Sequence, residues 1–184
     1  VPVQYGNCLY NCAAFISEGK ICGIVPKINI PTYSEFYEGR WFASGKGIVN
    51  EFITIDDESI PFGTDLLFSN NNGILIGTEI CEDLWVMYKP GTQACMAGAN
   101  ILVNPSASDE VIGKYEYRRN LVSSHSGDCY CGYIYSSAGN DESSTDLVFS
   151  GHCMIAESGK ILNECIYPGK DHIVSALIDL DQIN

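Results

Sequence analysis

The chain has 184 residues, of which 46% are hydrophobic and 18% are charged. This length suits one domain with a buried core, and this composition excludes an intrinsically disordered chain. The formal net charge is −13, which disfavours binding to nucleic acid or to an anionic membrane, because phosphates are bound by clustered Lys and Arg.

Nine cysteines are present, at positions 8, 12, 22, 81, 95, 129, 131, 153 and 165. Their odd number and irregular spacing argue against a secreted disulfide scaffold. We interpret most of them as small buried hydrophobic residues and expect a cytoplasmic protein. No apolar run is long enough for a transmembrane helix, and no signal peptide is recognisable. The chain begins without Met in a strand-like segment, so we expect residues to precede position 1.

Three segments have the pattern of a β-hairpin, in which two apolar runs flank a tight turn. They are residues 8–26 with Glu18-Gly19 at the turn, residues 64–80 with 70–73 at the turn, and residues 152–166 with Ser158-Gly159 at the turn. The pattern also predicts helices over 91–98 and 113–126, a strand over 100–104 and a last strand over 173–179. This mixed order indicates an α/β protein with packed sheets and outer helices.

The strongest local feature is the segment 77–85, Gly-Thr-Glu-Ile-Cys-Glu-Asp-Leu-Trp, in which an apolar strand ends at Cys81. A strand end fixes the position of a nucleophile, and a sharp exit exposes the sulfur and frees nearby backbone N–H groups. In a chain with eight other cysteines, a structural role for this one is the simpler alternative. However, Glu79, Glu82 and Asp83 surround it with negative charge, which disfavours a thiolate. A catalytic Cys81 therefore needs a nearby cation.

Lys27 is the candidate cation, because it follows the strand predicted over 20–26 directly. Most lysines at strand ends are solvated, and this remains the alternative for Lys27. The loop that follows is unusually rich in aromatic residues, namely Tyr33, Phe36, Tyr37, Trp41 and Phe42. Aromatic side chains among paired charges are typical of an ordered loop beside a pocket.

Two motifs together carry a family resemblance: residues 26–42, Pro-Lys-x-x-x-Pro-x-Tyr-x-Glu-Phe-Tyr-Glu-x-Arg-x-Phe, and residues 79–85, Glu-Ile-Cys-Glu-Asp-Leu-Trp. This pair resembles the nitrilase, or carbon–nitrogen hydrolase, superfamily, and more narrowly the glutaminase domain of glutamine-dependent NAD synthetases. Further matching segments cover almost the whole chain, at 104–108, 113–119, 142–149 and 151–156.

The resemblance implies a nitrilase-like α-β-β-α sandwich, truncated at its N-terminus, with residues 1–184 forming a fragment of one hydrolase domain. It also implies a Glu–Lys–Cys triad. By position, Cys81 matches the nucleophile, Lys27 the lysine and Glu35 a second glutamate that supports the site. The backbone N–H of Glu82 would join Lys27 around the oxyanion.

Substrate contacts are implied in the same way. Tyr33 and Ser108 fall where the synthetase branch contacts glutamine, Lys114 falls where some members carry an Arg, and we assign Trp85 to the same pocket. The triad's general-base glutamate precedes the lysine in the family, but Glu18 is the only acidic residue before Lys27 and does not match. We therefore expect the base before residue 1 and an inactive isolated fragment.

The implied activity is hydrolysis of the side-chain amide of glutamine through a cysteine thioester, with ammonia supplied for ATP-dependent amidation of deamido-NAD. The resemblance implies no cofactor in this domain, since ATP and Mg belong to the absent synthetase domain. The expected partners are glutamine, that synthetase domain in the same full-length chain, and further copies in a homo-oligomer.

Three other interpretations remain open. One is a stand-alone amidase, nitrilase or carbamoylase, and another is an inactive fragment with a structural role. The third is a zinc site built from His125, Cys129, Cys131, His152 and Cys153. The spacing of two cysteines one residue apart is unlike that of a zinc knuckle, so we predict no metal site.

Overall fold

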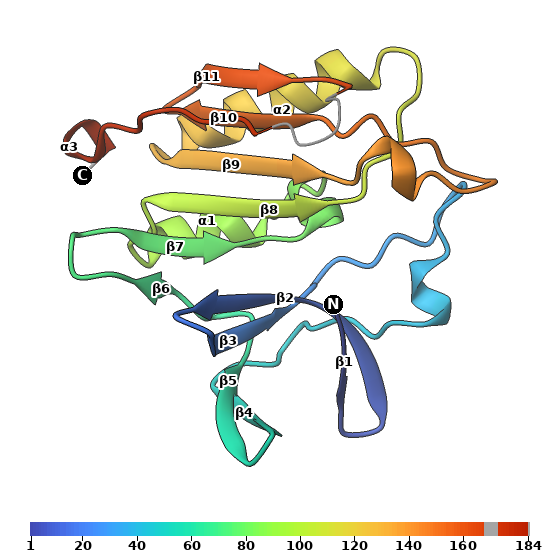
Figure 1. The fold of residues 1–184 in the computed structure, drawn as a ribbon, viewed down its shortest axis with the longest axis vertical. Coiled ribbons are helices and arrows are strands. Elements are labelled where there is room, and N and C mark those ends of the chain that lie inside the picture. The colour runs from blue at the N-terminus through green and yellow to red at the C-terminus, as the bar shows by residue number, and fades with distance from the viewer. Residues whose placement is uncertain (168–172, 184) are drawn as a thin grey trace.

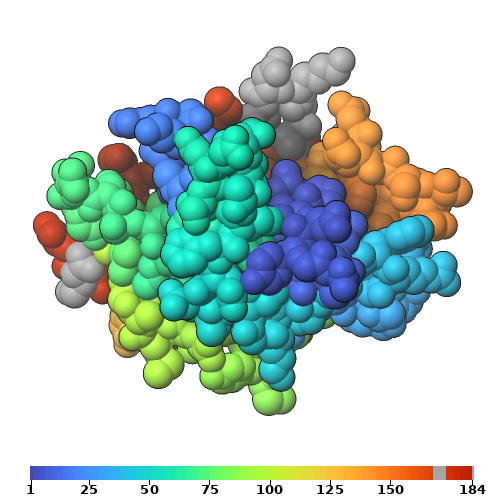
Figure 2. All heavy atoms as spheres, turned by 90° about the horizontal axis from the view of Figure 1, so that it is seen from below, coloured from blue at the N-terminus to red at the C-terminus, as the bar shows by residue number. Residues whose placement is uncertain are grey.

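The computed structural model describes residues 1–167 and 173–183. Its strands form a five-stranded sheet in the order β1-β2-β3-β5-β4 and a six-stranded sheet in the order β11-β10-β9-β8-β7-β6 (Figure 1). Two longer helices lie against the six-stranded sheet. Seen from below, residues from the N-terminal third, in blue and cyan, cover much of the face shown in Figure 2.

The five-stranded sheet consists of β1 (Pro2–Tyr5), β2 (Cys8–Ser17), β3 (Lys20–Pro26), β4 (Glu51–Ile55) and β5 (Glu58–Phe62). The hairpin β2–β3 confirms the first predicted hairpin. Its turn residues Glu18 and Gly19 have φ values of 51° and 76°, as a two-residue type I′ turn requires. Strands β3 and β5 pair in parallel at Ile24 and Phe62, which are both buried.

The six-stranded sheet consists of β6 (Phe68–Ser69), β7 (Leu75–Thr78), β8 (Ile101–Ser106), β9 (Gly132–Ser137), β10 (Cys153–Glu157) and β11 (Lys160–Cys165). Strands β7, β8 and β9 are parallel to one another, whereas the other neighbours are antiparallel. The carboxyl ends of the three parallel strands therefore meet at one edge, which is where open α/β sheets place their ligands.

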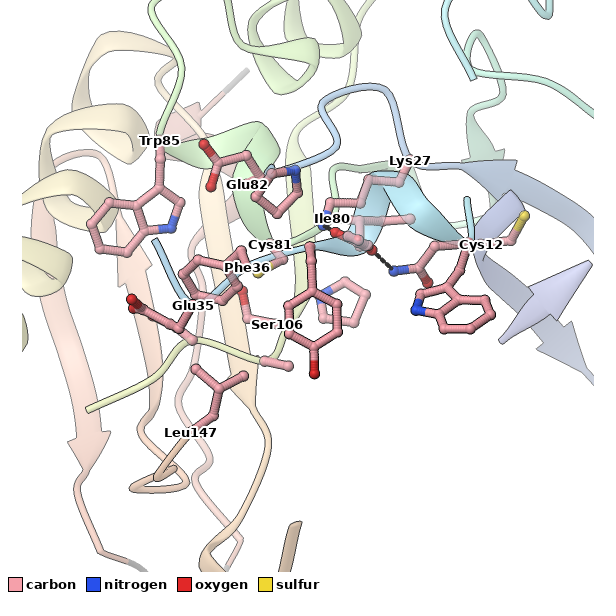
Figure 3. Close-up of a pocket in the computed structure, with 18 of the residues that line it drawn as sticks. Cys12, Lys27, Glu35, Phe36, Ile80, Cys81, Glu82, Trp85, Ser106 and Leu147 are labelled. Atoms are coloured by element: carbon pink, nitrogen blue, oxygen red, sulfur yellow. Dashed lines mark hydrogen bonds and ion pairs between the residues drawn. The ribbon is translucent and has the colours of Figure 1, made fainter. Parts of the chain in front are cut away.

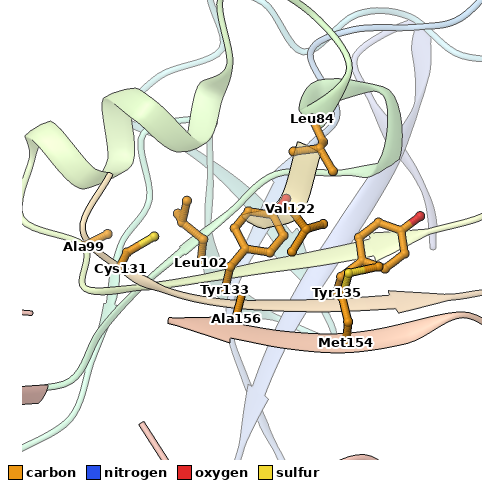
Figure 4. Packing of buried hydrophobic residues seen from close by; sticks show 9 residues of the cluster. All are labelled: Leu84, Ala99, Leu102, Val122, Cys131, Tyr133, Tyr135, Met154 and Ala156. Atoms are coloured by element: carbon orange, nitrogen blue, oxygen red, sulfur yellow. The ribbon is translucent and has the colours of Figure 1, made fainter. Parts of the chain in front are cut away.

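The helices are α1 (Pro90–Met96), α2 (Lys114–Asp128) and the short α3 (Leu180–Ile183), with the one-turn helices η1 (Glu38–Arg40), η2 (Cys81–Leu84) and η3 (Asn140–Glu142). Helix α1 packs on β7, and α2 packs on β9, β10 and β11. The main hydrophobic core lies between these helices and the six-stranded sheet, and it includes Leu102, Val122, Tyr133 and Met154 (Figure 4). The predicted helices are both confirmed, within two residues at each end.

The two sheets contact each other through aromatic side chains. The ring of Phe15 in β2 stacks on that of Phe68 in β6, with 4.2 Å between centroids. Gly23 in β3 allows this approach, because a Cβ there would lie 2.8 Å from the Phe68 ring. The predicted α/β architecture is confirmed, and in the described residues it consists of two packed sheets with helices against one of them.

Two sequence predictions need correction. The hairpin at 64–80 exists, but β6 has only two residues, because Thr64 and Asp65 form hydrogen bonds with Ile48 and Asn50 instead of continuing the strand. The strand predicted over 173–179 is wrong, and this segment forms no regular structure. It is held instead by side chains: Asn163 Nδ2 donates to the Ser175 carbonyl, and Glu157 accepts from the Asp179 N–H. None of the helices in residues 1–167 and 173–183 could span a bilayer.

Candidate active site

A pocket of about 430 Å³ opens beyond the carboxyl end of β7, between the two sheets' loops (Figure 3). Its wall includes six residues that the sequence predicted for the site: Lys27, Glu35, Cys81, Glu82, Trp85 and Ser108. The structure therefore brings the candidate nucleophile and the candidate cation into one cavity, although they lie in different segments of the chain.

Cys81 lies at the sharp exit from β7. It has a φ of 49°, a left-handed conformation that non-glycine residues adopt rarely and that is often found at functional sites. Its N–H donates to Oδ1 of Asn104 at 3.0 Å. Asn104 is itself fixed, since it accepts from the Ser106 hydroxyl and donates to the buried Tyr133 hydroxyl, both at 2.9 Å. The position of Cys81 is therefore set through its backbone by the neighbouring strand.

Asp83 connects the Cys81 turn to the segment that follows Lys27. Its buried carboxylate accepts hydrogen bonds from the Ile80 N–H at 2.9 Å and from both the backbone and side-chain N–H of Asn29 at 2.8 Å. Burial raises the pKa of Asp83, and these hydrogen bonds oppose the shift. One side chain thus fixes the two halves of the site relative to each other.

Lys27 is almost fully buried, with 2% of its surface exposed. Its ammonium group forms an ion pair with Glu38, and the same carboxylate accepts a hydrogen bond from the Asn11 side chain. Glu35 also lines the pocket, but it has no hydrogen bond or ion pair with any described residue. The role predicted for Glu35 stays a prediction, and the contact of Glu38 with Lys27 was missed.

Two cysteines line the pocket, and their surroundings differ. Cys12 in β2 is 3% exposed, and burial raises its pKa to about 12. A thiol in such surroundings is a poor nucleophile, because the thiolate is the reactive form. Cys81 is only half-buried, at the start of η2. Of the two, Cys81 is the one placed for covalent chemistry.

Glu82 follows Cys81 directly in the wall of the pocket. Glu82 is the second residue of η2, and the first N–H groups of a helix lack intrahelical acceptors. The Glu82 carboxylate accepts a hydrogen bond from the Tyr33 hydroxyl, at 2.9 and 3.0 Å from its two oxygens. Burial and this contact raise the pKa of Tyr33, so its hydroxyl remains a donor. Tyr33 does not line the pocket itself, but it holds a residue that does.

Lys114 likewise lies behind the pocket wall. It forms an ion pair with Asp109, and its Nζ lies 5.5 Å and 5.2 Å from the ring centroids of Phe36 and Trp85. Both rings line the pocket. A cation over an aromatic face is attracted by the ring quadrupole, so Lys114 orders the aromatic wall and places a positive charge beside it.

The residues of the zinc alternative are not assembled. His125 Nδ1 lies 3.6 Å from the Cys129 sulfur, whereas His152 Nδ1 lies 3.2 Å from Arg118 Nη1. Within the part of the chain that the structure describes, no three or more His, Cys, Asp or Glu side chains are grouped to hold a metal ion.

A two-sheet α/β fold whose pocket joins a cysteine at a strand end to a buried lysine defines a class of amide-cleaving enzymes. The chain belongs to the carbon-nitrogen hydrolase family, whose pattern matches residues 1–184. Among curated relatives, the glutamine-dependent NAD(+) synthetase of Mycobacterium tuberculosis is 43% identical over 89% of this chain and 24% of its own length. The human enzyme of the same name is 30% identical over 100% of this chain and 27% of its own length.

Solved structures give the same result. A glutamine-dependent NAD(+) synthetase from Cytophaga hutchinsonii has a TM-score of 0.78 and 29% identity, over 89% of this chain and 26% of its own. A carbon-nitrogen hydrolase from Helicobacter pylori has a TM-score of 0.68 over 100% of this chain and 61% of its own, and at 20% identity it supports the fold alone. The resemblance inferred from the motifs is confirmed. The chain spans about a quarter of the length of these curated relatives.

Proposed function

We propose that this chain is the glutamine-hydrolysing part of a glutamine-dependent NAD synthetase, with Cys81 as its nucleophile. The observation that carries the proposal is the shared pocket of Cys81 and Lys27. The name of the relatives that are 43% and 41% identical to the chain supports the choice of glutamine as substrate.

In the first step, the Cys81 thiolate attacks the side-chain carbonyl carbon of glutamine. The carbonyl oxygen becomes an oxyanion, which the Lys27 ammonium group and the Glu82 N–H stabilise. Donors fixed before the reaction are effective because they need no reorganisation as charge develops. The contacts of Lys27 with Glu38, and of the Cys81 turn with Asn104, support this arrangement.

In the second step, the tetrahedral intermediate collapses, the C–N bond breaks and ammonia leaves with a proton. A thioester to Cys81 remains. Water then attacks the thioester carbonyl, and glutamate and the free thiol are released. The acidic residues that line the pocket are Glu35, Glu38 and Glu82, and all follow Lys27 in the chain. A glutamate of the longer protein would transfer the protons, as the family resemblance implies.

The rim of the pocket suits the zwitterionic end of glutamine. Glu35 and Glu82 can attract its ammonium group, and the charge of Lys114 beside the wall can attract its carboxylate. Trp85 and Ser108, which line the pocket, would complete the contacts with substrate, and Tyr33 would act through its hydrogen bond to Glu82.

The proposed hydrolysis uses no cofactor in this chain. ATP and Mg would serve the synthetase domain of the same full-length protein, which would use the ammonia to amidate deamido-NAD. We also propose a cytoplasmic location, because the nine cysteines are free and thiols stay reduced in that compartment. A homo-oligomeric assembly is part of the same proposal.

The test is Cys81→Ala in the full-length protein. We expect glutamine-dependent NAD formation to be lost and ammonia-dependent formation to be retained. Cys12→Ala is the matched control, because it removes the other thiol of the same pocket, and it should reduce glutamine-dependent activity by no more than about three-fold. Equal loss of both activities in Cys81→Ala, or an equal effect of Cys12→Ala, would contradict the proposal.

A further inference from the structure

Three cysteines lie together on the side of the six-stranded sheet that the helices cover. Cys95 belongs to α1, Cys129 is the C-cap of α2, and Cys131 precedes β9. Cys131 is fully buried in the main hydrophobic core, and the other two thiols pack against this core and are half-buried. None of the three lines the pocket of Cys81.

His125 lies between this cluster and a buried carboxylate. Its Nδ1 is 3.6 Å from the Cys129 sulfur, and its Nε2 is 3.5 Å from Oε1 of Glu79. The imidazole is 3% exposed and Glu79 is 1% exposed. His125 thus lies between the Cys129 sulfur and the Glu79 carboxylate, at ion-pair distance from Glu79, although its Nε2 forms no hydrogen bond with a described residue.

The charges in the cluster favour a thiolate on Cys129. The groups that act on Cys129 are His125 from α2, Cys95 from α1 and Cys131, and Glu79 from the end of β7 acts on His125. Burial opposes protonation of His125, but its contacts with Cys129 and Glu79 outweigh this and raise its pKa to about 9. Hydrogen bonds from Cys131 and Cys95, and then from His125, lower the pKa of Cys129. The hydrogen bond between Cys95 and Cys129 raises the pKa of Cys95 to about 12, so Cys95 keeps its proton until it reacts.

We propose that Cys129 is a second reactive thiol of this protein, a site of oxidation by hydrogen peroxide, with Cys95 as the thiol that resolves it into a disulfide. The Cys129 thiolate attacks one oxygen of the peroxide, the O–O bond breaks, and sulfenic acid and hydroxide form. The hydroxide takes the proton of Cys95, and the resulting Cys95 thiolate attacks the Cys129 sulfur. An S–S bond forms, the S–O bond breaks, and the departing hydroxide takes a proton from the His125 imidazolium and leaves as water. Overall, two thiols are oxidised and one peroxide is reduced to two waters. The disulfide would join α1 to the end of α2.

The first test measures alkylation by iodoacetamide, in full-length protein carrying Cys81→Ala so that the proposed nucleophile does not compete. Peptide mass spectrometry would give the rate at each cysteine between about pH 5.5 and 7.5, a range in which the rate of an ordinary thiol rises roughly ten-fold per pH unit. The exposed Cys8 and Cys22 are the controls. We expect the rate at Cys129 to change by less than about three-fold across that range. A rise parallel to that of Cys22 would overturn the proposal without any variant at this site.

The second test uses variants of the cluster. His125→Asn should slow alkylation of Cys129 at about pH 6 by at least ~10-fold, because the imidazolium would be gone. After treatment with hydrogen peroxide, a non-reducing peptide map should show Cys95 joined to Cys129, and Cys95→Ser should abolish this cross-link while Cys129 still forms sulfenic acid. A map in which Cys129 stays a free thiol, or is joined to another cysteine, would overturn the assignment.

Discussion

The ends of strands β7 and β3 both supply a residue to the pocket, but they hold it in different ways. Cys81, after β7, is fixed through its backbone by a left-handed turn and by the hydrogen bond to Asn104. Lys27, after β3, is fixed through its side chain by the ion pair with Glu38. The sulfur can therefore be replaced without moving the turn, whereas the ammonium group depends on a second side chain from a loop.

The largest expected effect on turnover among these variants comes from substitution of Lys27. Lys27→Met should reduce glutamine-dependent turnover by about 10²–10³-fold, because one oxyanion donor is lost. Ammonia-dependent activity, measured in the same preparation of full-length protein, is the internal control. A loss of less than about three-fold would mean that Lys27 does not contact the reacting oxygen.

The next prediction compares turnover in variants of two glutamates that belong to one motif. Glu38→Gln removes the charge that faces Lys27, and we expect turnover to fall by roughly 10–10²-fold, because the ammonium group is then misplaced. Glu35→Gln is the comparison variant, because Glu35 lines the same pocket without an ion pair and is assigned only to attraction of the substrate's ammonium group. Steady-state kinetics would rank the two variants. If Glu35→Gln is the more damaging, the role that the motif assigns to Glu35 is correct and the ion pair is secondary.

Asp83→Asn tests the connection between the two strand ends. The amide keeps one acceptor but turns a donor toward the N–H group of Ile80 or of Asn29. We expect the free energy of unfolding to fall by about 1–3 kcal/mol, as for a buried donor left unsatisfied. Urea denaturation measures this directly. Unchanged stability would mean that Asp83 does not tie the two segments together.

The smallest effect concerns the support beneath Cys81. Tyr133→Phe removes the hydroxyl that accepts from Asn104 and donates to Glu79, and we expect a loss of about 1–2 kcal/mol in stability with turnover reduced several-fold. Tyr135→Phe is the matched control in the same strand, because the buried Tyr135 hydroxyl has no hydrogen-bond partner among the described residues. Equal effects of the two variants would contradict the support assigned to Tyr133.

Much of the site could be predicted because it depends on short local patterns. An apolar strand that ends at Cys81, and another that ends at Lys27, are visible in the sequence, and the family motifs place them in one pocket. The roles of Glu38, Asp83 and Asn104 depend on partners distant in sequence. The motif gave no physical reason to prefer Glu38 to Glu35, since only the one-turn helix η1 directs Glu38 toward Lys27.

The same reason explains the errors in the fold. The hairpin of β2 and β3 was predicted because its turn chemistry is local. The hairpin of β4 and β5 was missed, because its turn at Asp56 and Asp57 contains no glycine, although both residues have positive φ, at 49° and 65°. The strand predicted over 173–179 was wrong because alternating apolar residues do not by themselves supply a neighbouring strand. Its Ile173 and Leu177 are 84% and 95% exposed.

The central claim is that the Cys81 sulfur and the Lys27 ammonium group act on one bound amide. The most direct measurement is covalent labelling of the full-length protein with a glutamine analogue that carries a diazoketone in place of the amide, followed by peptide mass spectrometry. We predict a single adduct on Cys81, formed far more slowly in Lys27→Met. An adduct on another cysteine, or labelling of Cys81 at the same rate in Lys27→Met, would contradict the account.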